Sequence, residues 1–349
     1  MRATTDPSSR LARRLDAIGF ALGAVTIAWA IVVSGAAGGS ARPFVSLVVA
    51  AGVGIVLARG LERRLIRSVP LLVVCGVGGS FLLDRLGSGQ WGDPLGYANA
   101  SAALAVGAMV AALMLIVPPS PLPLRVVGVL GALAFGATPF ILGARTAGSL
   151  VVVIALAFGV GWVMRWPRRG VVVAAILALI VLGATVALGV SGAGEPGSIT
   201  ARVVDTSLTE ARLALWHDAL EIVADHPITG VGWGGFATTS PIARADEDLR
   251  YTHNEFLQVT AESGILGGLL VVLIFAWGFA RIYVGAGPDP MAVLGAIALA
   301  AMGISASVDY VLRFPAVGLT TALLVGAAQA GRRVTERTRE LAELQFPAA

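Results

Sequence analysis

The chain has 349 residues, of which 56% are hydrophobic and 13% are charged, and its mean hydropathy is +0.84. Soluble domains carry about 25% charged residues, so this composition excludes an ordinary soluble protein and favours a membrane protein with many spans. The net charge of +4 is the difference between 25 basic and 21 acidic residues, and all of the basic residues are arginine. Membrane topology explains that charge, and it gives no reason to expect a nucleic-acid partner.

Repeated apolar runs predict transmembrane helices. A helix needs about 20 mainly apolar residues to cross the hydrocarbon core of a bilayer, and frequent glycine and alanine suit helices that pack closely. We therefore predict an all-α polytopic membrane protein with about ten transmembrane helices. The segments lie at roughly 17–37, 43–59, 69–84, 98–118, 124–143, 147–164, 170–191, 257–281, 290–307 and 310–330.

The distribution of arginines predicts the orientation of these helices. Cytoplasmic loops of membrane proteins carry an excess of basic residues, and short loops count most. With the N-terminus inside, 17 of the 25 arginines lie in cytoplasmic segments and 8 lie outside, four of these in one long loop. We therefore expect both ends of the chain on the cytoplasmic side.

These segments divide the chain into four parts. Residues 1–191 are expected to form an N-terminal bundle of about seven helices, 192–256 an extracytoplasmic loop, 257–330 about three further helices and 331–349 a cytoplasmic tail. Loops longer than about 12–15 residues are usually functional or disordered. This one holds all three histidines of the chain, so we expect a functional site there.

Part of the long loop predicts an amphipathic helix at the outer membrane boundary. The stretch SLTEARLALWHDALEIVADHP begins with Ser207 and Glu210 at capping-box spacing. Four apolar side chains then fall on one helical face, namely Leu213, Trp216, Leu220 and Val223. The GVGWGGF that follows predicts a turn whose backbone can approach another group closely.

Two arginines on the outer side are candidates for binding a phosphate group. Arg145 lies in LGARTAGS, between the fifth and sixth segments, and Arg212 lies on the amphipathic helix. The planar guanidinium matches a phosphate through two parallel hydrogen bonds. A structural role is also open for each: Arg145 can reach lipid headgroups, and Arg212 can pair with Glu210 or stack on Trp216.

A polar cluster before the eighth segment is the candidate for acid–base chemistry. In RYTHNEF, His253 is flanked by Arg250, Asn254 and Glu255. Histidine is the usual general base near neutral pH, and a histidine that only caps the following helix is the structural alternative. The histidines show no HxxxH, HxH or HExxH spacing, so we expect neither a metal site nor a cofactor.

Two further polar segments lie on the outer side. The acidic run at 246–248 is best interpreted as a solvated loop. In LGSGQWGDPLGYANAS, Asn99 stands at the start of the fourth segment. It is a candidate polar contact, with a plain helix N-cap as the alternative.

Taken in order, these elements resemble the O-antigen ligase and polymerase superfamily of bacterial envelope glycosyltransferases. The family pattern has an arginine and a tryptophan on an amphipathic helix, then a proline, a Gly-x-Gly turn ending in phenylalanine, and a His-Asn pair that leads into a span. Here it reads ARLALWHDALEIVADHPITGVGWGGF and RYTHNEFLQVTAESGILGG, over about 212–270. GYANA, GARTAG and SASVDYVLRFP resemble further family motifs, although Ala144 and Thr146 replace the usual serine and glycine beside Arg145.

The resemblance implies a GT-C-like enzyme of the bacterial inner membrane whose site faces the periplasm. Its reaction would be an inverting, metal-independent transfer of a glycan from a polyprenyl-diphosphate carrier to the hydroxyl of a glycan, lipid or protein acceptor. A ligase, a polymerase and a protein O-glycosylating enzyme all remain open. So do a transporter or flippase of a lipid-linked or anionic substrate, and an inactive scaffold.

The resemblance also implies roles for the candidate residues. Arg145 and Arg212 would stabilise the diphosphate leaving group, and His253 would take the proton of the attacking hydroxyl. Asn254 or Glu255 would orient the histidine ring. The residues expected to bind substrate are Asn254, Glu255, Arg250, Trp216 and Asn99.

Overall fold

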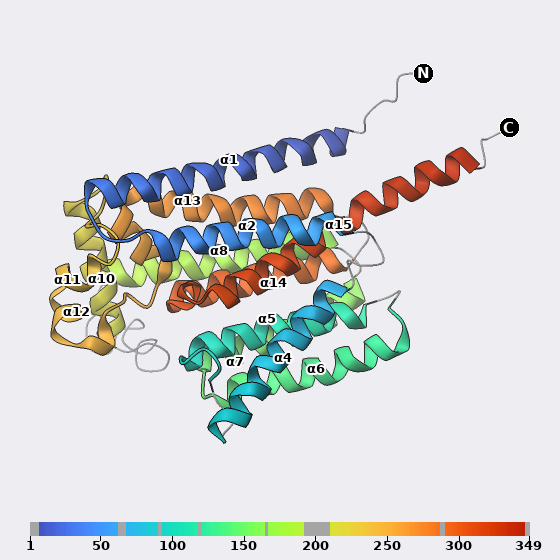
Figure 1. The fold of residues 1–349 in the computed structure, drawn as a ribbon, viewed down its shortest axis with the longest axis horizontal. Helices are drawn as coiled ribbons and strands as arrows, with labels where there is room; N and C mark the ends of the chain where they lie inside the picture. The colour runs from blue at the N-terminus through green and yellow to red at the C-terminus, as the bar shows by residue number, and fades with distance from the viewer. Residues whose placement is uncertain are drawn as a thin grey trace.

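In the computed structural model the described residues are helical, with no β-strand among them, which confirms the predicted all-α class. The long helices lie side by side in a bundle (Figure 1). They are α1 (Pro7–Ala36), α2 (Arg42–Gly60), α4 (Ser68–Ser88), α5 (Ala98–Ile116), α6 (Leu122–Ile141), α7 (Arg145–Met164), α8 (Pro167–Ser191), α13 (Glu255–Gly285), α14 (Met291–Val308) and α15 (Pro315–Gln345). The structure describes residues 7–61, 68–89, 93–117, 120–164, 167–191, 210–286 and 290–345.

The described helices agree with the predicted membrane spans. Eight are long and apolar enough to cross a membrane, and α7 and α15 contain the shorter apolar stretches Arg145–Gly159 and Pro315–Ala330. Each of the ten coincides with one predicted segment. Helices α5 and α14 are the most enclosed, whereas α1, α2 and α8 bury few of their residues, as lipid-facing helices do.

The boundaries of the last span differ from the prediction. The segment predicted at 310–330 begins as a helix only at Pro315, because Asp309–Phe314 forms a loop with a short 3-10 helix, η2 (Val311–Arg313). Proline suits the first turn of a helix, where its missing N–H costs nothing. Helix α15 then continues to Gln345, so the predicted span and the start of the predicted tail are one helix.

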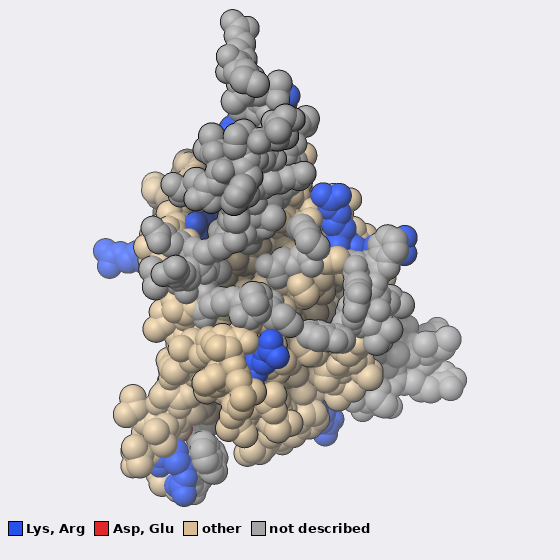
Figure 2. All heavy atoms as spheres, turned by 90° about the vertical axis from the view of Figure 1, so that its right-hand side faces the viewer, with Lys and Arg blue, Asp and Glu red and all other residues tan. Residues whose placement is uncertain are grey.

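The long loop and the chain termini lie at opposite ends of the bundle (Figure 1). The loop contains α10 (Glu210–Asp225), α11 (Phe236–Thr239), α12 (Pro241–Ala245) and η1 (Glu247–Leu249). Arginine side chains surround the end with the termini (Figure 2). This arrangement agrees with an even number of crossings. Residues 192–209, which include the predicted cap Ser207, lie outside the described residues.

Three helices are joined by ion pairs at the end that carries the termini. Asp16 of α1 accepts hydrogen bonds from Arg59 of α2 at 2.5 Å and from Arg281 of α13 at 2.7 Å. Arg281 is only 2% exposed, so its charge is stabilised by this carboxylate. Both arginines belong to the set that the sequence places on the cytoplasmic side.

Helix α10 is anchored through the face that the sequence predicts to be apolar. Leu213 and Trp216 are fully buried, and Leu220 and Val223 pack at the edge of the same cluster. The helix lies against α8 and α13. The predicted amphipathic helix is therefore confirmed over residues 210–225, with its apolar face packed on the protein.

The glycine-rich turn approaches the backbone of α13. The amide of Val231 donates to the carbonyl of Ala261 at 3.0 Å, and the amide of Ile265 donates to that of Pro227 at 2.9 Å. Gly264 interrupts α13 with a φ of 75°, and a Cβ there would collide with the backbone of the turn. The close approach predicted for the turn is thus made with the start of α13, and glycine is required for it.

Candidate functional site

Asp309 collects polar groups from separate parts of the chain. It directly follows α14 and is 4% exposed. Nδ1 of His253 lies 3.1 Å from its Oδ1. The hydroxyl of Tyr97 donates to the carboxylate at 2.8 Å, and the side-chain amide of Asn99 donates to Oδ2 at 2.6 Å. The carboxylate therefore joins the start of α5, the end of α14 and the loop before α13.

Arg212 reaches the same carboxylate from α10. One of its terminal nitrogens donates to the carbonyl of Val308 at 3.0 Å, and the other lies 3.7 Å from Oδ2 of Asp309. The Arg212 side chain is 21% exposed. The guanidinium is thus fixed by its neighbours while part of the side chain stays exposed.

The charge of Asp309 fixes the tautomer of His253. Burial alone would raise the pKa of Asp309, but the hydrogen bond from His253 and the positive charge of Arg212 hold it below its usual value. An ionised carboxylate only accepts hydrogen bonds, so Nδ1 of His253 carries the proton. In the neutral form of the ring, the free lone pair then belongs to Nε2. Burial and the charge of Asp309 raise the pKa of Tyr97, which keeps its hydroxyl protonated.

His253 has an unusual backbone conformation. Its φ is 52°, and among the described residues it is the one non-glycine residue with a positive φ. Such strain is sparse in proteins and clusters at functional sites. The adjacent Thr252 holds the conformation, because its carbonyl accepts from Nε1 of Trp216 at 2.8 Å and its amide donates to Gln258 at 2.8 Å.

Asn254 caps α13, so the proposed alternative in which His253 is the cap does not apply. Its Oδ1 accepts from the amide of Leu257 at 3.1 Å, and its Nδ2 donates to the hydroxyl of Thr185 at 3.2 Å. The side chain is fully buried. Asn254 therefore positions the loop. The side chain that contacts the His253 ring is that of Asp309, whereas Asn254 or Glu255 was expected in this role from the sequence.

A second charged cluster lies beside the first. Nε of Arg313 lies 3.9 Å from Glu255, and a terminal nitrogen of Arg313 lies 3.9 Å from Glu262. The guanidinium also lies 4.0 Å above the ring of Tyr251. Glu255 and Glu262 are almost fully buried, whereas the Arg313 side chain is 30% exposed. The two carboxylates share one arginine.

The structure brings only some of the predicted residues together. His253, Arg212 and Asn99 converge on Asp309, so Asn99 is a polar contact of the site and the helix N-cap is Tyr97. Trp216 is fully buried behind the site. Arg145 and Arg250 are exposed, and neither side chain has a hydrogen bond or ion pair with another described residue.

The sequence prediction did not include Asp309, Tyr97 or Arg313 among the site residues. A signal for two of them was present, because SASVDYVLRFP places an acid and an arginine in a short interruption between two apolar segments. Polar residues at such positions are costly beside lipid and usually functional. Among the residues that the structure describes, no group of His, Cys, Asp and Glu is arranged to hold a metal ion.

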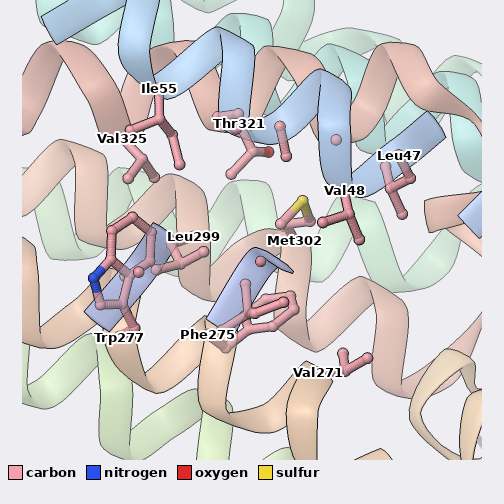
Figure 3. Close-up of a pocket in the computed structure, with 18 of the residues that line it drawn as sticks. Leu47, Val48, Ile55, Val271, Phe275, Trp277, Leu299, Met302, Thr321 and Val325 are labelled. Carbon is pink, nitrogen blue, oxygen red and sulfur yellow. The ribbon is translucent and has the colours of Figure 1, made fainter. Parts of the chain in front are cut away.

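An apolar groove lies among the long helices. It is bordered by α1, α2, α13, α14 and α15, and Val48, Phe275 and Met302 are among the side chains that line it (Figure 3). Its lining runs from Asp16 and Arg59 at one end to Phe44 and Leu312 at the other.

The outer end of the groove meets the loops that carry the site. Phe44 stacks on Trp233 of the glycine-rich turn, with ring centroids 4.9 Å apart. Leu312 lies in η2, between Asp309 and Phe314. An apolar chain in the groove would therefore end close to the charged cluster.

Several apolar helices of spanning length define a multi-pass membrane protein, and one comparison shows which family part of the chain resembles. Residues 130–272 match the model of the family described as O-antigen ligase. The match includes Arg145, Arg212 and His253 and ends before Asp309. It confirms the resemblance to the O-antigen ligase superfamily and supports a function in membrane glycan transfer. A comparison with curated proteins found no match.

Proposed function

We propose that the protein is an integral-membrane glycosyltransferase that moves a glycan from a polyprenyl-diphosphate carrier to an acceptor hydroxyl. The observation that carries the proposal is the contact of His253 with Asp309, with Arg212 beside it, in a segment that resembles O-antigen ligases. We place the enzyme in the bacterial inner membrane with this site on the periplasmic side. The arginine distribution supports that orientation.

His253 acts as the general base. Nε2 accepts the proton of the acceptor hydroxyl while its oxygen attacks the anomeric carbon of the donor, and the bond from that carbon to the diphosphate oxygen breaks. Attack from the face opposite the leaving group inverts the anomeric centre. The carboxylate of Asp309 stabilises the imidazolium that forms, and such proton transfer typically contributes about 10²–10⁴-fold to the rate.

Arg212 stabilises the diphosphate that leaves. A guanidinium stays charged at any physiological pH and matches phosphate oxygens in a planar fork. Two contacts hold Arg212 in place before substrate arrives, so little reorganisation is needed as charge develops. Arg145 and Arg250, both exposed, are proposed as further contacts for the diphosphate or the glycan. No metal or cofactor is part of this proposal.

The groove suits the polyprenyl chain of the donor. An isoprenoid is entirely apolar, and the groove lining is apolar apart from its inner end. Burying such a chain contributes about 25 cal/mol per Å² of apolar surface. With its chain in the groove, the donor would present its diphosphate at the outer end, near Leu312 and Asp309. Most groups for the chemistry then come from the loop at 192–256, while the helices of 1–191 and 257–330 hold the lipid.

The test is a transfer assay with the purified protein in lipid nanodiscs. A polyprenyl-diphosphate oligosaccharide prepared from the source membranes serves as donor, and release of polyprenyl diphosphate and extension of the glycan are measured. We expect activity in the wild type, a loss of at least about 100-fold in His253→Ala, and normal activity in His217→Ala, whose exposed side chain pairs with Glu221 on the surface of α10. Donor binding without turnover in the wild type would contradict the proposal and favour a transporter.

A further inference from the structure

Aromatic side chains gather around the candidate site. The rings of Tyr97 and Tyr310 are stacked with centroids 4.6 Å apart, and Tyr251 lies 4.9 Å from Tyr310. Phe314 lies 5.8 Å from Tyr97. The cluster contains three of the four tyrosines in the chain. We call these four residues the aromatic cluster.

The aromatic cluster touches the candidate general base. The ring of Tyr310 meets His253 edge-on, with centroids 5.0 Å apart. All four members of the cluster are half-buried, so each keeps part of its ring accessible. A ligand resting on these rings would lie within reach of the histidine.

The surroundings of the cluster differ from those of an aromatic belt at a lipid boundary. Belt residues face lipid headgroups from the outside of a bundle. Here the rings pack against Asp309 and His253, which are buried in the protein, and against the partly exposed Arg313. The cluster therefore faces the inside of the site.

The polar groups beside the cluster suit a ligand rich in hydroxyl groups. The buried carboxyl groups of Glu255 and Glu262 both face Arg313, so its guanidinium is already shared between two acidic side chains. A phosphate or a uronate would compete with them for the same guanidinium. One oxygen of Glu255 and Nε of Arg313 are also buried without a hydrogen-bond partner among the described residues. Arg313, being 30% exposed, can donate to hydroxyl groups.

We infer that the aromatic cluster and Arg313 form a subsite for a neutral pyranose ring next to His253. The apolar C–H face of the sugar rests on the aromatic rings, while its hydroxyls accept hydrogen bonds from Arg313. Aromatic residues with a few placed polar groups are the usual composition of small-molecule sites. This inference rests on the proposed function for its role in transfer, because a sugar in the subsite places a hydroxyl or an anomeric carbon at the base. The binding of a sugar at this subsite does not depend on the proposed function.

Binding is tested without turnover. Saturation-transfer NMR is recorded on the full-length protein in nanodiscs with a panel of neutral methyl hexopyranosides. We expect saturation of at least one glycoside in the wild type, a reduction of about fivefold or more in Tyr251→Leu, and retention in Tyr251→Phe, which keeps the ring. Tyr283→Leu is the control, since Tyr283 lies on α13 beside Arg168 and away from the site. Equal saturation in Tyr251→Leu and Tyr283→Leu, or none in the wild type, would overturn the inference.

A kinetic arm identifies the source of the sugar. If the ring belongs to the acceptor, Tyr251→Leu raises the KM for acceptor about tenfold and leaves that for donor unchanged. If the ring belongs to the donor, Tyr251→Leu raises the KM for donor and leaves that for acceptor unchanged. A fall in kcat with both KM values unchanged would contradict the subsite. A protein that binds glycosides through Tyr251 but transfers nothing would retain the subsite and refute the proposed function, so the two failures are distinguishable.

Discussion

Nδ1 of His253 lies 3.1 Å from Oδ1 of Asp309, although the two residues are 56 positions apart and α13 and α14 lie between them in the chain. The start of α13 and the end of α14 lie at the same end of the bundle, so the contact depends on the antiparallel packing of the two helices. The contact fixes the histidine ring and its tautomer, and several predictions depend on it.

Asp309 makes the stability of the protein depend on pH in the acidic range. Its pKa in the folded protein lies below the ordinary value near 3.8, so the ionised carboxylate stabilises the fold above that value, and this contribution is lost as the pH falls through the folded-state pKa. Asp309→Asn lacks this contribution. We expect the difference in Tm between wild type and Asp309→Asn to be full above about pH 5 and to shrink as the pH falls below 3.8. A difference that is constant over this range would contradict the assignment.

Trp216 acts through the backbone beside His253. Trp216→Phe leaves the buried carbonyl of Thr252 without its indole donor, which costs about 1–3 kcal/mol, and loosens the strained loop. We expect a lower Tm together with reduced transfer activity. Trp29→Phe is the control, because Nε1 of Trp29 also donates to a backbone carbonyl, that of Ser263, but not beside the histidine. Equal losses of activity in both variants would show that the loss follows from destabilisation in general, and would contradict a specific role of Trp216 beside His253.

The groove predicts a difference between two glycines that face open space. A Cβ at Gly52 or at Gly76 would meet no atom within 4 Å, but only Gly52 lines the groove. Gly52→Leu should therefore fill part of the groove without distorting the fold. We expect it to lower the retention of undecaprenyl diphosphate, measured by native mass spectrometry, whereas Gly76→Leu retains it. Equal amounts of bound undecaprenyl diphosphate in both variants would show that the lipid chain binds outside the groove.

Gly264 is predicted to be essential for the outer loop. Alanine at this position must adopt a φ of 75° and would collide with the carbonyl of Ile228. Backbone strain alone costs about 1–3 kcal/mol, so we expect Gly264→Ala to unfold at clearly lower temperature. Gly79→Ala, where a Cβ meets no atom within 4 Å, should leave Tm nearly unchanged. A Gly264→Ala variant as stable as Gly79→Ala would contradict the packing of the turn on α13.

The sequence predicted the fold better than the site. Apolar runs long enough to cross a membrane are local signals, and all ten reappear as helices because lipid leaves a chain few other ways to satisfy its backbone. The apolar face of α10 was equally readable from Leu213 and Trp216. The segment at 310–314 was assigned to the last span, because Val311 and Leu312 look apolar and only Pro315 marks the true start of α15.

The contacts of the site could not be read from local patterns. His253, Arg212 and Asn99 were identified by residue type and order, but their common partner depends on where the end of α14 lies in space. Asn254 and Trp216 were expected at the substrate because they stand beside the histidine or the arginine in the family pattern. Burial distinguishes their roles, since both side chains are fully enclosed.

The most direct test of the His253–Asp309 pair as a catalytic unit is a double-mutant cycle in the transfer assay. If Asp309 acts by orienting and stabilising the His253 ring, each of His253→Ala and Asp309→Asn slows transfer strongly, and the double variant is no slower than His253→Ala alone. Rate losses that multiply in the double variant would show that the two residues act independently, and would contradict the pair as the catalytic unit of the proposed transfer.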